Sequence, residues 1–420
     1  MPFRLIERPA GADEGPAIKD VAHGVRIRKV PAACNCCVEH MNATPKTPTR
    51  RRSARWIAAV QVVALSAGAV QAGTGPAAAS APAPGAVTSA AAATLPPELA
   101  PLATGQRIEY VSTDVTGAGI TVTGLVLTPR TNRTFKTVAW GHGTTGLADQ
   151  CAPSANQDLF WPEARAAVAE LLKRGWTVAA ADYPGLGTPA PHPYLIGESA
   201  ARSMIDSVKA ARNLDHSLTN QYAVDGHSQG GQAALFAGQL AAGYDNSLVL
   251  RGVAAIAPVS NVDLIAPFIP GTAQQGYLVM ALYGLAAVEA SFNPQTLLPP
   301  PSRQRTSVLE SGCLLEILNR YAPLPAKQLV VDGALPQSVL ESLAHYDNPA
   351  QSASSAPILI VQGTADEAVP YAITAGPLLD ELSAYPQPVQ FEPVEGATHD
   401  GAVFASTTLV ADWIAARFSS

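Results

Sequence analysis

The sequence is poor in charged and aromatic side chains and contains few cysteines. Charged residues make up 14% and aromatic residues 6% of its 420 positions, and five cysteines occur. This composition excludes a coiled coil, which needs many charged residues. Hydrophobic residues still make up 47% of the chain, so it is not a largely disordered protein. With 33 glycines and 36 prolines, the sequence is typical of a compact, loop-rich, exported protein.

Common cofactor-binding motifs are also missing from the sequence. It contains no Walker loop, no His-Glu-x-x-His pair and no zinc-type cysteine spacing. A G-x-G occurs at residues 185–187, but the rest of a dinucleotide-binding fingerprint does not follow it. The sequence therefore predicts a protein that uses neither a metal ion nor another cofactor.

The apolar run near the N-terminus is too short for a membrane span. Residues 56–70 are mostly apolar, whereas a spanning helix needs about 20 such residues. Four arginines at positions 50, 51, 52 and 55 precede the run, and Val70 and Ala72 stand at positions −3 and −1 of a cleavage site. This layout predicts a secretory signal peptide over about 41–72. Residues 1–40 are then upstream of a start at Met41, or form a long basic region.

Removal of residues 1–72 changes the charge and the cysteine count. The segment holds 11 of the 27 basic and 5 of the 33 acidic residues, so the remainder has a net charge of −12. Such a surface disfavours nucleic acids and anionic lipids as partners. Only Cys151 and Cys313 remain, and an even pair in an exported chain predicts a disulfide. Two buried free thiols are the alternative.

The remaining chain divides into a linker, a core and an insertion. Residues 73–96 are almost all Ala, Gly, Pro, Ser and Thr, which predicts a flexible linker. Apolar strand-like and helix-like segments then alternate over 97–261 and 356–420, which predicts an α/β fold with a mostly parallel sheet covered on both faces. Residues 262–355 contain proline clusters and helical patterns but no strand-like segment, which predicts a helical cap over the C-terminal edge of the sheet.

The predicted elements are as follows. Residues 107–114 and 120–127 form an antiparallel opening pair. The other strands are expected at 137–140, 176–181, 222–226, 248–256, 357–361 and 389–394. The core helices are expected at 160–173, 196–214, 230–242, 374–383 and 403–418.

Residues 226–230, GHSQG, fit the pattern G-x-S-x-G. They lie between a predicted strand and a predicted helix, which is the structural context that makes this common pattern specific. A tight turn there exposes the hydroxyl of Ser228 above the sheet and places it beside the free N–H groups of a helix N-terminus. Ser228 is therefore the candidate nucleophile, and a purely structural turn is the alternative.

A serine nucleophile needs a base, and an acid that orients the base. Two histidines follow Ser228, and His399 lies between the last predicted strand and helix whereas His345 lies in the predicted cap. His399 is therefore the candidate base. Asp366 follows the strand at 357–361 and is the candidate acid, with the adjacent Glu367 as the alternative.

Acyl transfer also requires donors for the negative oxygen of the transition state. The residue after the nucleophile, Gln229, is expected to supply one backbone N–H. The loop GHGTTG at 141–146 is expected to supply the other from Thr144, with Thr145 and Gly143 as alternatives. Taken alone, this loop has a flexible glycine turn as its alternative interpretation.

Four segments together resemble the secretory lipase family of the lipase A type. They are WGHGTTG with DQCAPS at 140–154, DYPGLGTP at 182–189, GHSQGG at 226–231 and GTADEAVP at 363–370. The resemblance spans residues 95–420. It implies an α/β-hydrolase fold with an inserted helical lid, hydrolysis of carboxylic esters including acylglycerols by Ser228, Asp366 and His399, and a disulfide from Cys151 to Cys313 in the lid.

The sequence thus predicts a secreted serine esterase or lipase. Its expected partner is a lipid or small ester substrate, met through transient contact with a lipid interface, with no nucleic acid and no obligate protein partner. The apolar stretch at 277–288 is expected to line an acyl tunnel or to pack as an ordinary core helix. A serine peptidase of the same fold and a non-catalytic surface protein are the alternatives.

Overall fold

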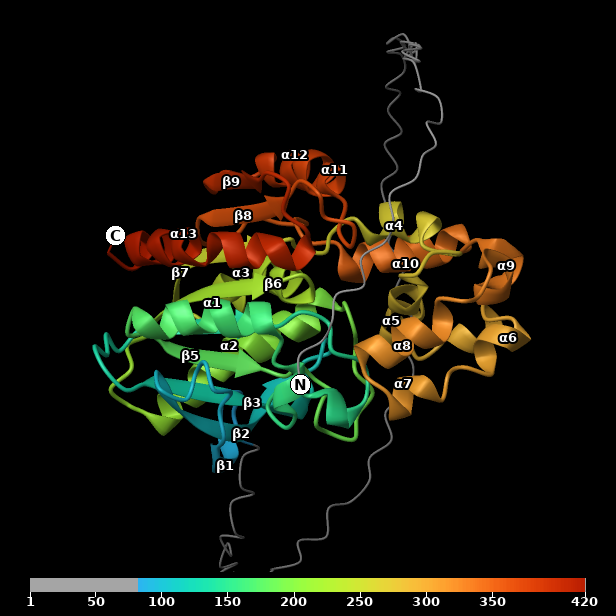
Figure 1. Ribbon diagram of the computed structural model, residues 1–420. Coiled ribbons are helices and arrows are strands. Elements are labelled where there is room, and N and C mark those ends of the chain that lie inside the picture. The colour runs from blue at the N-terminus through green and yellow to red at the C-terminus, as the bar shows by residue number, and fades with distance from the viewer. Residues whose placement is uncertain (1–81, 420) are drawn as a thin grey trace, which may run out of the picture. The chain divides into compact units, whose positions relative to one another are not determined.

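The computed structural model describes residues 82–419 (Figure 1). The predicted signal peptide at 41–72 and residues 73–81 of the predicted linker lie outside the described residues. Within the described part, a nine-stranded sheet carries helices on both faces, and a group of short helices lies at one end of it. This is the arrangement expected from alternating strands and helices.

The sheet has the order β1-β2-β3-β5-β4-β6-β7-β8-β9. The first three strands pair antiparallel, β3 pairs antiparallel with β5, and the strands from β5 to β9 run parallel. The strands are β1 (Val87–Ala93), β2 (Ala103–Thr113), β3 (Gly119–Pro129), β4 (Thr137–Gly141), β5 (Thr177–Ala181), β6 (Gln221–His227), β7 (Val249–Ile256), β8 (Ile358–Gly363) and β9 (Val389–Val394). Each strand predicted from the sequence is present.

Helices pack on both faces because the central parallel strands are apolar on both sides. On one face lie α2 (Gly197–Leu214), α3 (Gln229–Tyr244) and α12 (Leu379–Ser383), and on the other lie α1 (Pro162–Lys173) and α13 (His399–Ser419). Every residue of β4 and β8 is buried. The last helix begins four residues earlier than predicted. Its first residue is His399, so the candidate base sits at a helix N-terminus instead of in a free loop.

The prediction of a flexible linker is wrong for residues 87–93. They form β1, which pairs antiparallel with β2 at the edge of the sheet. Leu95 and Leu99 beyond it are buried. An edge strand made mostly of Ala, Thr and Ser carries no alternating apolar pattern. It is stabilised by backbone hydrogen bonds to β2, which the residue types do not reveal. Composition alone could therefore not distinguish it from a linker.

The cap consists of short helices with an apolar core of its own, which includes Leu282, Ile317 and Tyr321. Its helices are α4 (Val262–Ile265), α5 (Gln275–Ala286), α6 (Pro300–Arg303), α7 (Val308–Ser311), α8 (Leu314–Tyr321), α9 (Ala326–Leu329) and α10 (Gln337–Asp347). The cap's two ends meet where the N–H of Val262 donates to Asn348 Oδ1 at 2.7 Å. Between residues 82 and 419, no helix is both long and apolar enough to cross a membrane.

Candidate active site

Ser228 occupies the turn between β6 and α3 with a strained backbone. Its φ and ψ angles are 59° and −118°, a backbone conformation that residues other than glycine rarely adopt. The turn is held because the N–H of Ser228 donates to the carbonyl oxygen of Ile256 on β7 at 2.9 Å. Strain at such a turn is the expected feature of a nucleophile elbow.

Three glycines allow the N-terminus of α3 to approach the sheet this closely. A Cβ atom on Gly226 would lie 2.2 Å from the carbonyl oxygen of Gly230. A Cβ atom on Gly230 would lie 2.0 Å from the carbonyl oxygen of Gly141 at the end of β4. Any side chain at these positions would therefore push α3, and with it Ser228, away from the strand ends.

His399 and Asp366 form a hydrogen-bonded pair at the same end of the sheet. His399 Nδ1 lies 2.7 Å from Asp366 Oδ2, and the Asp366 carboxylate is fully buried. This bond places the ring proton on Nδ1 and leaves Nε2 of His399 free to accept a proton. The alternative acid, Glu367, is exposed, and its carbonyl oxygen accepts a hydrogen bond from Gln274 in the cap.

Asp366 is held in position by three further hydrogen bonds. Its Oδ1 accepts from the N–H groups of Ala368 and Val369 at 2.8 and 2.9 Å, and its Oδ2 accepts from Gln362 Nε2 at 2.8 Å. Gln362 is buried on β8, and its Oε1 accepts from the hydroxyl of Thr374. Sequence reasoning missed Gln362, and a polar residue at the end of an otherwise apolar strand was the signal available.

His227, next to the nucleophile, is buried beside His399, with ring centroids 4.5 Å apart. Burial, and then the neighbouring His399, lower the pKa of His227 well below its usual value, so its ring is neutral. Ligand atoms of His227, His399 and Asp400 lie within 4.8 Å of one another and could hold a metal ion. Such an ion would occupy the nitrogen of His399 that faces away from Asp366, so we assign no metal to this group.

The loop after β4 places Thr144 and Gly143 in the same cleft as Ser228 and His399. Thr144 is fixed on two sides: its hydroxyl lies 2.8 Å from that of Tyr194, and its carbonyl oxygen accepts from Trp161 Nε1 at 3.2 Å. Thr145 does not line the cleft. Thr144 and Gly143 therefore remain candidates for the second oxyanion donor.

Gln229, the expected source of the first donor, is the first residue of α3. Its N–H therefore has no carbonyl partner within the helix. Its side chain lies 3.3 Å from His192 Nε2, and His192 Nδ1 lies 2.6 Å from the carbonyl oxygen of Pro184. Burial lowers the pKa of His192 to about 4, so its neutral ring donates to Pro184 and accepts from Gln229. His192 is a second support that the sequence did not reveal.

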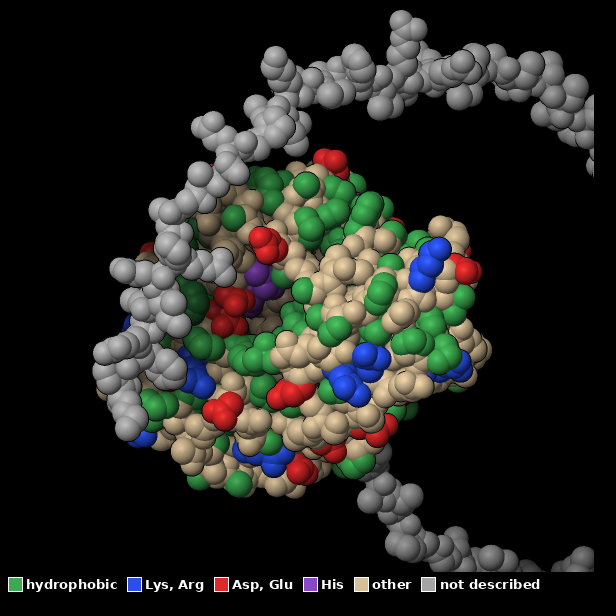
Figure 2. Space-filling view, turned by 45° about the vertical axis from the view of Figure 1, so that its right-hand side comes forward, with side chains coloured by type: hydrophobic (Ala, Val, Ile, Leu, Met, Phe, Trp, Pro, Cys, Tyr) green, Lys and Arg blue, Asp and Glu red, His purple; other side chains and the backbone are tan. Residues whose placement is uncertain are grey.

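Two spaces meet at Ser228. A narrow apolar pocket of about 70 Å³ extends into the cap, where Leu278 and Ala281 of α5 line it. A wider cleft of about 350 Å³ contains Ser228 and His399 and opens to the surface. Figure 2 shows a hollow in which a histidine side chain lies between acidic side chains. We call the narrow space of about 70 Å³ the apolar pocket and the wider space of about 350 Å³ the His399 cleft.

Glu163, in the first turn of α1, lines the His399 cleft although it is only 6% exposed. Burial, with a contribution from Asp400, raises the pKa of its carboxyl group to about 7. A carboxylate kept in such a position costs stability, and groups of this kind are concentrated at functional sites. Sequence analysis did not single out Glu163.

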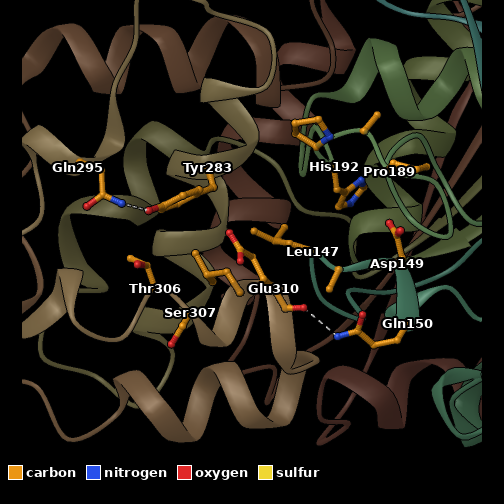
Figure 3. Close-up of a pocket in the computed structure, with 14 residues that line it drawn as sticks. Leu147, Asp149, Gln150, Pro189, His192, Tyr283, Gln295, Thr306, Ser307 and Glu310 are labelled. Atoms are coloured by element: carbon orange, nitrogen blue, oxygen red, sulfur yellow. Dashed lines mark hydrogen bonds between the residues drawn. The ribbon is translucent and has the colours of Figure 1, made fainter.

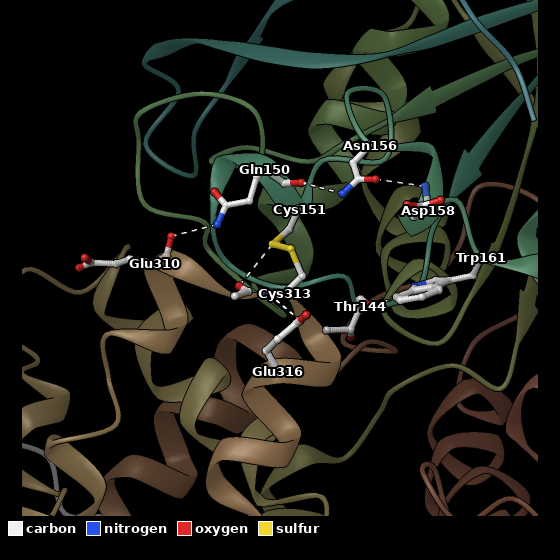
Figure 4. The surroundings of a disulfide bond; sticks show 10 residues. Thr144, Gln150, Cys151, Asn156, Asp158, Trp161, Glu310, Cys313 and Glu316 are labelled. Carbon is white, nitrogen blue, oxygen red and sulfur yellow. Dashed lines mark hydrogen bonds between the residues drawn. A yellow bond between two sulfur atoms is a disulfide. The ribbon is translucent and has the colours of Figure 1, made fainter.

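A disulfide joins the loop after β4 to the cap (Figure 4). Cys151 and Cys313 have Cα atoms 5.6 Å apart although 162 residues separate them, and this confirms the predicted disulfide. Cys313 precedes α8, and its N–H donates to Glu316 of that helix. Gln150 Nε2 adds a second link by donating to the carbonyl oxygen of Glu310 at 3.1 Å. The loop after β4, which we call the oxyanion loop because it holds the candidate second donor, is therefore fastened to the cap at α7 and at the start of α8.

A larger cavity of about 740 Å³ lies between the cap and the core, away from these catalytic candidates (Figure 3). Leu147, Asp149 and Gln150 line it from the core side, and Tyr283 and Glu310 line it from the cap. It contains none of the three candidate catalytic side chains. Size alone therefore does not identify the active site.

Comparison with known proteins places this geometry in a family. Residues 162–420, more than half of the chain, match the family model described as secretory lipase. The protein belongs to the secretory lipase family. No curated protein matches the chain closely enough to count as a relative.

Solved structures share the fold. Lipase A of Candida antarctica in its closed state superposes with a TM-score of 0.68 at 20% identity, over 80% of this chain and 83% of the lipase. A putative hydrolase of Legionella pneumophila gives 0.67 at 20% identity, over 79% of this chain and 98% of that one. The rice cell wall degrading esterase LipA of Xanthomonas oryzae gives 0.62 at 21% identity, over 79% and 97%. The chain thus has the α/β-hydrolase fold that these structures share.

Proposed function

We propose that this member of the secretory lipase family is a secreted serine hydrolase of carboxylic esters, with Ser228 as nucleophile, His399 as base and Asp366 as its orienting acid. The observation that carries the proposal is the meeting of a strained Ser228 with the His399–Asp366 pair at one cleft. A structural turn would need neither the pair nor the cleft.

The residues suggest the following sequence of steps. Ser228 Oγ attacks the ester carbonyl while His399 Nε2 takes its proton, and Asp366 stabilises the imidazolium that forms. The oxyanion accepts hydrogen bonds from the N–H of Gln229 and from the loop at Thr144. His399 then protonates the leaving alcohol, and water hydrolyses the acyl-enzyme by the same route in reverse.

The position of His399 distinguishes the acyl side of the site from the alcohol side. His399 lines the His399 cleft but not the apolar pocket, whereas Ser228 lines both. Because the base must reach the leaving oxygen, the alcohol belongs in the His399 cleft and the acyl chain in the apolar pocket. This assigns Leu278 and Ala281 of the apolar stretch at 277–288 to the acyl side, whereas Tyr277 lines both spaces.

The small apolar pocket favours short acyl chains. Its volume corresponds to only a few water molecules. Assays with p-nitrophenyl esters of increasing chain length are expected to show higher kcat/KM for acetate and butyrate than for palmitate. A maximum at palmitate would mean that the cap opens widely and that long-chain lipids are the substrates.

A serine-to-alanine pair tests the catalytic assignment. Ser228→Ala is expected to abolish ester turnover and labelling by a fluorophosphonate without loss of the fold, and the exposed Ser383→Ala is expected to change neither. Unchanged turnover in Ser228→Ala would reject the nucleophile. A wild-type protein that neither turns over esters nor reacts with the fluorophosphonate would support a non-catalytic surface protein.

The alternative of a peptidase that recognises a free N-terminus has less support. Such an enzyme needs a carboxylate on the acyl side to hold the ammonium group, and no charged residue of the described chain lines the apolar pocket. Aminoacyl p-nitroanilides compared with p-nitrophenyl esters separate the two activities, and faster hydrolysis of the anilides would favour the peptidase.

Export and contact with lipid complete the proposal. The disulfide and the family match are consistent with secretion, and N-terminal sequencing of the exported protein is expected to begin after Ala72. At the rim of the His399 cleft, Leu315 and Phe404 are 58% and 52% exposed. Their exposure supports the proposal of a transient contact with an uncharged lipid interface.

A further inference from the structure

The His399 cleft combines carboxylates with aromatic walls. Glu163 and Asp400 line it together with Trp161, Tyr277 and Phe404. No lysine or arginine of the described residues lines this cleft. Aromatic side chains with neighbouring carboxylates are the groups that proteins use to bind ammonium cations. Of the residues that the structure describes, no charged one lines the apolar pocket on the other side of Ser228.

Glu163 lacks an ion-pair partner among the described residues. It is only 6% exposed and lines the cleft, yet no ion pair joins it to any of the described residues. Arg165, two positions along the same helix, is turned away. It donates to the carbonyl oxygens of Phe160 and Gln157 and pairs with Glu98. A nearly buried carboxylate without a counter-ion is costly, and a cationic ligand would remove that cost.

The location of Glu163 and Asp400 decides which part of a substrate they contact. Both lie on the side of the leaving alcohol, because they share the cleft with His399, which must protonate that alcohol. Asp400 directly follows His399 at the start of α13. The two carboxylates therefore face the alcohol portion and not the acyl portion of an ester.

We propose that the alcohol side of this site selects esters of cationic alcohols, such as amino alcohols and choline-like quaternary ammonium alcohols. This inference rests on the proposed ester hydrolysis by Ser228 and names the substrate class of the same site. Glu163 and Asp400 neutralise the ammonium group, and Trp161, Tyr277 and Phe404 enclose its methyl groups.

The chemical balance of the reaction is unchanged by the cation. The bond from Ser228 Oγ to the acyl carbon forms, and the bond from that carbon to the alcohol oxygen breaks. The proton that His399 took from Ser228 passes to the departing alcohol. The ammonium charge is present in both substrate and product, so no further reactant is needed.

The test uses two esters of the same shape. Acetylcholine is compared with its uncharged carbon analogue, in which a tert-butyl group replaces the trimethylammonium group. The measured quantity is kcat/KM for acetylcholine divided by kcat/KM for the uncharged analogue. This ratio is then divided by the ratio of the two rate constants for alkaline hydrolysis without enzyme, which corrects for the intrinsic reactivity of the esters. The normalised ratio is expected to be about 10 for the wild type, and Glu163→Gln is expected to lower it about tenfold.

A matched variant controls for the loss of a surface charge. Glu310 is an exposed acid of the cap that lines the larger cavity away from Ser228. Glu310→Gln is expected to keep the wild-type ratio. In addition, choline is expected to inhibit wild-type hydrolysis of the neutral ester more strongly than the uncharged alcohol does. This measurement needs no variant and holds even where Glu163→Gln folds poorly.

The outcomes separate this inference from the proposed function. Hydrolysis of both esters with a normalised ratio near one would overturn the cation preference and leave the ester hydrolase intact. An equal fall of the ratio in Glu163→Gln and Glu310→Gln would also overturn it, because the effect would then arise from the general negative field. Failure to hydrolyse any ester would reject the proposed function itself.

Discussion

The N–H of Leu314 in the cap donates a hydrogen bond of 2.8 Å to the carbonyl oxygen of Thr145 in the loop after β4. The Cys151–Cys313 disulfide lies beside this bond, so α8 and the oxyanion loop are joined twice. Gly146 makes the close approach feasible, because a Cβ atom there would lie 2.7 Å from Cys151 Sγ. The cap can therefore not swing away from the core at α8 without moving the oxyanion loop.

The disulfide is expected to support both stability and catalysis. Replacing both Cys151 and Cys313 by serine is expected to lower the free energy of unfolding by about 3–5 kcal/mol, because the loop that it closes is long. It is also expected to lower kcat, because the oxyanion loop loses its attachment to α8. Denaturant unfolding and ester hydrolysis, with and without dithiothreitol, measure the two effects. Dithiothreitol is expected to change neither the stability nor the kcat of the double variant. A fully reduced wild type with unchanged stability and kcat would contradict this role of the disulfide.

Gln362 is expected to act as a positioning residue for Asp366. Gln362→Leu removes the donor to Asp366 Oδ2, so kcat is expected to fall about tenfold with little change in KM. Gln390→Leu is the matched control, because Gln390 lies on the neighbouring strand and its exposed side-chain amide donates to Glu392. Steady-state kinetics over a range of pH give the measurement. If Gln362→Leu lowers the stability but leaves kcat unchanged, Gln362 has a structural role and does not position Asp366 for catalysis.

Thr144 and Tyr194 are expected to act as one unit through their hydroxyl pair. Thr144→Val and Tyr194→Phe are each expected to lower kcat several-fold, because the oxyanion loop loses the same hydrogen bond. The double variant is expected to be little worse than either single variant, with a coupling energy of about 1 kcal/mol. Additive losses in this double-mutant cycle would show that the two hydroxyl groups contribute independently.

Glu163 is expected to make the protein less stable as the pH rises. Its pKa is about 7 in the folded protein against an ordinary value of 4.5, mainly because of burial and also because of Asp400, with His399 and Arg165 opposing. The folded state therefore holds this proton over a range where the unfolded chain has released it. The resulting loss of stability develops between about pH 4.5 and pH 7.

The variant Glu163→Gln tests whether ionisation of Glu163 lowers the stability of the folded protein. The variant is expected to match the wild type near pH 4 and to exceed its free energy of unfolding by about 2 kcal/mol at pH 8. Denaturant unfolding at the two pH values measures the difference. A gain of the same size at both pH values would mean that ionisation of Glu163 is not the cause.

The candidate site was predictable where short segments carry the information. GHSQG at 226–230 specifies the elbow because its two glycines must lie where backbone atoms leave no room for Cβ. The order of Ser228, Asp366 and His399 then followed from which loops leave the C-terminal ends of parallel strands. The structure brings His399 and Asp366 together, as expected, and leaves Glu367 exposed and His345 in α10.

The sequence by itself determined the alternation of elements, the inserted cap and the set of catalytic candidates, because apolar periodicity and glycine sterics act over a few residues. Only the tertiary structure decided the supports: Gln362 under Asp366, His192 beside Gln229, and Tyr194 beside Thr144. It also decided that Glu163 is buried in the cleft and that residues 87–93 pair as a strand. Apart from the Gln362–Asp366 contact, which spans four positions and leaves a polar residue at the end of an apolar strand, these features depend on contacts between distant segments. No local pattern of residue types encodes those contacts.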